Sequence, residues 1–71
     1  MTLRTLYSGL SVKPEVLKIH PSETARIDVY NSSEIRRIVK GYANRTVRGL
    51  DISWTGYRLE VWLDEKKGAE D

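Results

Sequence analysis

The lack of cysteine most constrains how this chain folds. Its 71 residues contain no Cys and a single His, so disulfides, thiolate zinc sites and multi-histidine metal sites are excluded. So short a chain barely recovers the entropy lost on ordering its residues, and small domains often add disulfides, metals or partners to compensate. The fold must therefore rest on tight packing alone, on self-association or on a place in a larger assembly.

The composition is that of an ordinary soluble domain. Hydrophobic residues make up 39% and charged residues 31% of the chain. We expect one small β-rich domain over residues 1–64, followed by a disordered polar tail over 65–71. No apolar run approaches the roughly 20 residues of a membrane helix, and no signal-peptide pattern is visible. The expected location is the cytoplasm, or a virion or other assembly.

Alternating apolar residues predict strands in the first half of the chain. Thr24–Tyr30 places Ala25, Ile27 and Val29 on one face. Val16–Ile19 predicts the strand before it, with a turn at His20–Glu23 between the two. Leu6–Val12 also alternates, which predicts a first strand ended by the proline that follows.

A hairpin is predicted in the last third, where two alternating segments flank Thr55-Gly56. The apolar residues of both segments fall on one face only in one register, because a slip by one residue mixes the faces. That register pairs Trp54 with Tyr57, Ile52 with Leu59, Leu50 with Val61 and Asp51 with Glu60, and puts Trp62 opposite Gly49. We expect Tyr57–Leu63 to be an edge strand that carries Trp62 outward.

The middle of the chain admits two interpretations. Apolar residues at 35, 38, 39 and 42 have helical spacing, which favours a helix over Ser32–Lys40 capped by Asn31 or Ser32. The alternative is a strand over Ile35–Tyr42. The predicted fold class is therefore mainly β, a small sandwich or barrel of five to six strands, with room for one short helix at 32–40.

Residues Val12–Asn31 carry a resemblance to known domains. Pro14, a Leu-x-Ile strand at 17–19, the turn Pro21-Ser22 and a strand ending at Asn31 follow one another. This order resembles the opening of an immunoglobulin-like β-sandwich, as in major-sperm-protein-like domains and Ig-like modules of microbial surface proteins. The resemblance implies an Ig-like sandwich joined by Leu17, Ile19, Ile27 and Val29. It also implies binding rather than catalysis.

No catalytic constellation is visible in the sequence. His20 lies in a predicted turn without a nucleophile or orienting group nearby. Asp51 and Glu60 become cross-strand neighbours in the hairpin, an arrangement common on exposed sheet faces. Glycine-rich phosphate loops are absent from the sequence. We therefore expect no enzyme activity, catalytic residue, cofactor or metal.

The sharpest charge feature is a basic segment. From Glu34 to Leu50 the chain has five basic residues and one acidic residue. The candidate binding surface consists of Arg36, Arg37, Lys40, Arg45 and Arg48, with Trp62 and Tyr57 as aromatic candidates. A solvated helix face, or an arginine network that pairs with the acidic C-terminal end, is the favoured explanation of such basic residues. The predicted function is a non-catalytic protein–protein interaction or assembly module, with a protein partner or self-association. The alternative is a small nucleic-acid-binding β domain that uses segment 36–48.

Overall fold

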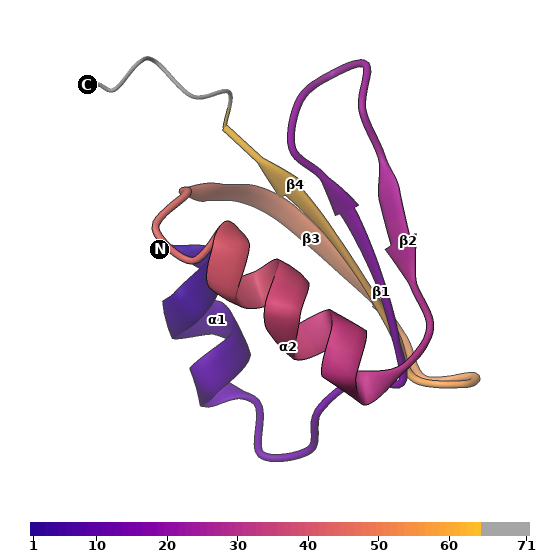
Figure 1. The fold of residues 1–71 in the computed structure, drawn as a ribbon. Coiled ribbons are helices and arrows are strands. Elements are labelled where there is room, and N and C mark those ends of the chain that lie inside the picture. Colours follow the sequence, from indigo (N-terminus) through magenta and orange to yellow (C-terminus); the bar gives the residue numbers. More distant parts are fainter. Residues whose placement is uncertain (65–71) are drawn as a thin grey trace.

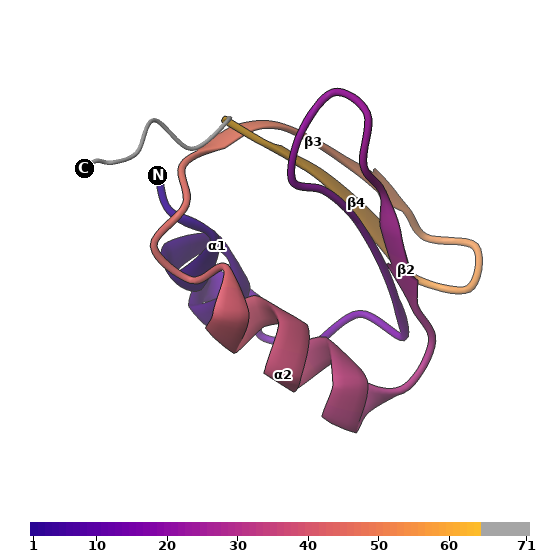
Figure 2. The same cartoon turned by 45° about the horizontal axis from the view of Figure 1, so that its top comes forward.

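The chain folds as one sheet backed by helices. A computed structural model describes residues 1–64, and the predicted tail over 65–71 lies outside them. In the described part, the elements are α1 (Leu3–Gly9), β1 (Val16–His20), β2 (Ile27–Val29), α2 (Ser32–Gly41), β3 (Val47–Ser53) and β4 (Arg58–Leu63). The four strands lie in the order β2-β1-β4-β3. Both helices pack on the same face of this sheet (Figures 1 and 2).

The predicted mainly β sandwich or barrel is wrong. Residues 1–64 form four strands in a single open sheet, and helices replace the second sheet that a sandwich would need. The two central strands, β1 and β4, run parallel, whereas β2 and β3 pair antiparallel at the edges. The predicted edge strand 57–63 is therefore an inner strand. Leu17, Ile19, Ile27 and Val29 share one sheet face and do not join two sheets.

The first segment is a helix, α1, although its apolar residues fit the strand period as well as the helix period. Leu6 and Leu10 alternate as in a strand, but Leu3, Leu6, Tyr7 and Leu10 also have the spacing i, i+3, i+4 and i+7. Thr2 caps the helix through its hydroxyl, which accepts a hydrogen bond from the Thr5 amide at 3.3 Å. Leu3, the first residue of α1, is fully buried. The predicted strand over Leu6–Val12 is thus wrong.

The predicted helix in the middle of the chain is confirmed. The Asn31 carboxamide accepts a hydrogen bond from the Glu34 amide at 2.9 Å, which caps α2. Ile35 and Val39 are buried against the sheet. The alternative strand over Ile35–Tyr42 is excluded.

The hairpin register is confirmed, with a correction at the turn. Leu50 lies opposite Val61, Ile52 opposite Leu59 and Gly49 opposite Trp62. The strands stop at Ser53 and restart at Arg58, so Trp54 and Tyr57 belong to the turn rather than to the ladder. Positive φ angles occur at Gly56 (71°) and Tyr57 (41°).

Strict alternation in β1 and β4 separates the core from the opposite side of the sheet. Leu17, Ile19, Leu59, Val61 and Leu63 are fully buried beneath the helices. The residues between them turn to the other side, which no described helix or strand covers; we call it the open face. Its residues are Val16, Lys18, His20, Asp28, Gly49, Asp51, Ser53, Arg58, Glu60 and Trp62.

The strand predicted over Thr24–Tyr30 is shorter than expected. Only Ile27–Val29 of the predicted Thr24–Tyr30 pairs with β1. Arg26 lies just before it, and its Nε is 3.2 Å from Asp28 Oδ1. This ion pair lacks the geometry of a hydrogen bond, since the same carboxylate oxygen has no hydrogen-bond partner within residues 1–64.

Candidate basic groove

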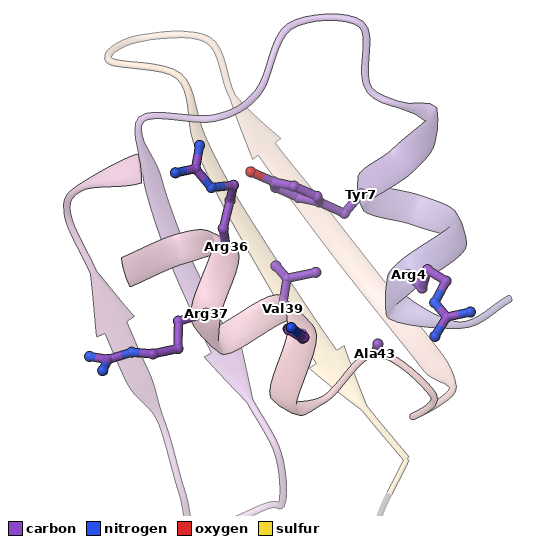
Figure 3. A pocket seen from close by; sticks show the side chains of 7 residues that line it. Arg4, Tyr7, Arg36, Arg37, Val39 and Ala43 are labelled. Carbon is purple, nitrogen blue, oxygen red and sulfur yellow. The ribbon is translucent and has the colours of Figure 1, made fainter. Parts of the chain in front are cut away.

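A groove of about 610 Å³ lies between the two helices, on the side away from the open face. We call it the basic groove. It is lined by Arg4, Tyr7, Arg36, Arg37, Val39, Lys40 and Ala43. In Figure 3 the Tyr7 ring projects from α1 toward α2, where Val39 faces it, while Arg4 and Arg37 extend away on opposite sides. Apolar atoms thus form the floor and cations form the rims.

The helical period places the α2 cations at this groove. Ile35 and Val39 point into the core, so Arg36 and Lys40, each one residue further along, lie together at the outer side of the helix. Backbone hydrogen bonds from Leu3 and Arg4 to the carbonyls of Arg45 and Ala43, each 3.0 Å long, fix α1 beside the end of α2. The fold therefore adds Arg4, some thirty residues earlier in the chain, to the basic surface.

The groove cations differ in their partners. One Nη atom of Arg37 lies 2.8 Å from both carboxylate oxygens of Glu34. The hydrogen bond with Glu34 and its negative charge raise the pKa of the Arg37 guanidinium above its ordinary value. Within residues 1–64, by contrast, Arg4, Arg36 and Lys40 form no ion pair. Three cations at one groove therefore lack a carboxylate partner there.

Tyr7 is held in place from the other side by Lys13. The Lys13 ammonium donates hydrogen bonds to the Tyr7 and Leu10 carbonyls at 2.7 and 2.8 Å, and it lies 4.7 Å from the centre of the Tyr7 ring. These contacts satisfy the last carbonyls of α1. They also fix the ring that forms part of the groove floor.

Two of the predicted binding residues make hydrogen bonds within the fold. Arg45 donates hydrogen bonds to the carbonyls of Pro21 and Asp64, at 2.6 and 2.7 Å. Arg48 donates to the Leu63 carbonyl at 3.3 Å. Neither residue lines the basic groove. The structure thus brings Arg36, Arg37 and Lys40 together with Arg4, and separates Arg45 and Arg48 from them.

The predicted aromatic candidates lie apart from each other and from the groove. Tyr57 sits in the hairpin turn, where its hydroxyl donates to the Val12 carbonyl and its ring lies 5.1 Å from that of Trp54. Trp62 lies on the open face, where its ring stacks on that of His20. Tyr57 therefore ties a loop to the turn, and Trp62 belongs to a different surface.

His20 has a partner that the sequence analysis missed. His20 is the last residue of β1 and does not lie in the predicted turn. Its Nε2 lies 2.6 Å from Glu60 Oε2. The parallel pairing of β1 with β4 creates this contact between residues 40 positions apart. Asp51 lies opposite Glu60 as predicted.

Over residues 1–64, no group of three or more His, Cys, Asp or Glu side chains is placed to hold a metal ion. In the same range, neither helix is long and apolar enough to cross a membrane.

Comparisons of the chain with protein-family models, with curated proteins and with solved structures found no match. The resemblance of residues 12–31 to immunoglobulin-like and major-sperm-protein-like domains therefore stays a prediction.

Proposed function

We propose that this chain binds nucleic acid by its phosphate backbone, through the basic groove. The observation that carries the proposal is the gathering of Arg4, Arg36 and Lys40 from two helices, with no ion pair to a carboxylate within residues 1–64. Unpaired cations on a surface repel one another and destabilise a fold, so their concentration is favourable when a polyanion neutralises them. Guanidinium groups suit phosphate because they donate two hydrogen bonds at once.

The shape of the groove favours an extended polyanion over a single enclosed phosphate. Arg4 and Arg37 extend outward on opposite sides, instead of converging on one point (Figure 3). A phosphate chain that crosses the two helices meets cations along its path. The Tyr7 ring on the floor offers an apolar surface to sugars or bases.

The experiment measures the affinity for fluorescently labelled single and double strands as a function of salt. Each phosphate contact contributes a slope of about −0.7 for single strands or −0.9 for duplex DNA to log K against log salt. The double variant Arg36→Ala/Lys40→Ala loses two contacts, so its slope of log K against log salt should be less negative by more than one unit on either ligand. Arg4→Ala alone should also weaken binding, because the groove spans both helices.

The matched control is Lys18→Ala/Arg58→Ala, which removes one lysine and one arginine from the open face. It changes the net charge equally and should leave most of the affinity intact. Equal losses in the two double variants would mean that net charge alone drives binding. Either that result or undetectable binding by the parent chain at low salt would contradict the proposal.

The assembly role predicted from the sequence is a second candidate, favoured by the free edge of β3. Within residues 1–64, β3 pairs with β4 on one side, and its other side has a backbone hydrogen bond only at Val47, which donates to Met1. Leu50, on the helix-side face of β3, is 39% exposed. An unprotected edge with an exposed apolar residue pairs readily with a second copy. Sedimentation at micromolar concentrations should show a dimer that Leu50→Lys abolishes, whereas Trp54→Lys, in the turn, leaves it intact. A monomer at every concentration would rule this role out.

A further inference from the structure

Three residues on the open face lie side by side across neighbouring strands. His20 of β1 lies opposite Trp62 of β4, and Trp62 lies opposite Gly49 of β3. Residues paired in this way point to the same face, and neighbouring strands are about 4.8 Å apart. The three positions therefore form a row in which the third has no side chain.

The two rings in this row are stacked. Their centroids are 4.8 Å apart and their planes differ by 6°, so both rings stand nearly parallel at the spacing of the strands. The contact between His20 Nε2 and Glu60 Oε2, at 2.6 Å, holds the imidazole in this orientation. One side of the Trp62 indole is thus occupied by a fixed partner.

The other side of Trp62 borders Gly49. A Cβ atom built on Gly49 would meet a single neighbouring heavy atom within 4 Å among the described residues, Cε3 of Trp62, at 3.8 Å. Trp62 remains partly exposed. We call this space, beside the indole and above Gly49, the stacking slot. Because the next ring position in the row is empty, a flat ring from outside can occupy it.

We infer that the stacking slot takes a nucleobase of a single strand, which stacks on Trp62 and extends the row begun by His20. The basic groove is a different surface, and this inference does not depend on the groove cations. Base stacking on aromatic side chains tolerates any base, because every base has a flat π face.

The charges around the slot favour a nucleic-acid strand whose phosphates lie on the Arg48 side of Trp62. Arg48 directly precedes Gly49, is exposed and uses its Nε for the Leu63 carbonyl. On the other side, Asp51 and Glu60 lie opposite each other at the next pair on this face of the hairpin. Phosphates are therefore favoured beside Arg48 and repelled beside the pair Asp51 and Glu60.

The position of the slot also suits a strand that reaches the helix side. The Val47 amide donates to the Met1 carbonyl at 2.8 Å, which places the start of β3 beside the start of α1. The start of β3, which carries Gly49, and the start of α1, which carries Arg4, therefore lie at the same end of the molecule (Figure 1). A peptide gains from this basic end only where it carries acidic side chains, whereas every nucleotide of a strand carries a phosphate charge.

The test follows the fluorescence of Trp62 in a Trp54→Phe background, so that a single indole emits. The probes are a short single-stranded oligonucleotide and an abasic strand of the same length. We expect the base-bearing strand to quench Trp62 and the abasic strand to leave it unchanged. Quenching to the same extent by both strands would overturn the inference.

Gly49→Val fills the slot with a side chain suited to a strand. The loss of one stacked base should raise about tenfold the concentration of base-bearing strand that gives half-maximal quenching. The matched control, Ser53→Val, lies on the same strand and face but away from Trp62, and it should behave like the parent. Thermal unfolding of both variants checks that each is folded. Unchanged quenching in folded Gly49→Val would also overturn the inference.

Trp62→Leu gives a second measurement that does not require a substitution at Gly49. By fluorescence anisotropy, it should remove the preference for the base-bearing over the abasic strand. A preference retained in this variant would contradict the inference. The groove double variant Arg36→Ala/Lys40→Ala separates the two proposals. It should weaken the binding of both oligonucleotides and leave the preference for the base-bearing one intact.

Discussion

At the scale of single residues, arginines close together in the sequence play different roles. Arg36 and Arg45 both belong to the basic segment, and the sequence does not distinguish them. The structure does, because Arg45 donates to two backbone carbonyls whereas Arg36 has no ion pair within residues 1–64. Composition reports the charge, but the tertiary contacts decide which charges remain available to a ligand.

This difference predicts opposite effects on stability and binding. Arg45→Ala removes charge-assisted hydrogen bonds to the Pro21 and Asp64 carbonyls, which should lower the free energy of unfolding by about 2 kcal/mol. Arg36→Ala, at an exposed helical position, should change it by less than about 0.5 kcal/mol. Urea denaturation measures both values. Equal effects would mean that the Arg45 contacts add nothing to stability.

At the scale of elements, the sequence predicted correctly those elements whose local pattern agrees with their tertiary contacts. The hairpin register and α2 were correct because both follow from periodicity, and α2 also has a capping asparagine. The strand predicted over Leu6–Val12 was wrong because Leu6 and Leu10 satisfy the strand period and the helix period alike. Local pattern did not reveal that β1 pairs with β4, since this parallel contact joins residues about forty positions apart.

The cap of α2 can be tested directly. Asn31→Ala removes the acceptor of the Glu34 amide and should lower the free energy of unfolding by about 1 kcal/mol. Asn31→Asp retains an acceptor and should recover most of the loss. Asn44→Ala, at an exposed turn position outside the helix, serves as the control. A loss as large in the Asn44 variant would show that the effect is not specific to the cap.

At the scale of the whole molecule, the sheet divides the surface into two chemistries. The helix side gathers cations at the basic groove, whereas the open face mixes both charges with stacked rings. The sequence predicted three groove residues, Arg36, Arg37 and Lys40. It missed Arg4, whose helix was taken for a strand. It predicted Trp62 opposite Gly49 but missed His20 beside Trp62, because that contact exists only once β1 lies beside β4.

Because the domain is small, the burial of the Leu3 side chain affects both the stability of the fold and the position of α1 at the basic groove. Leu3 is fully buried in the core and anchors α1, which at seven residues is too short to be stable alone. Leu3→Ala should cost about 2 to 5 kcal/mol, a large part of the roughly 4 to 10 kcal/mol expected for a chain of this length. Leu50→Ala, at a partly exposed position, should cost far less. Thermal unfolding measures both variants. Because Arg4 lies on α1, Leu3→Ala should also weaken nucleic-acid binding before the sheet unfolds, and a variant that lost stability but kept full affinity would place the binding surface elsewhere.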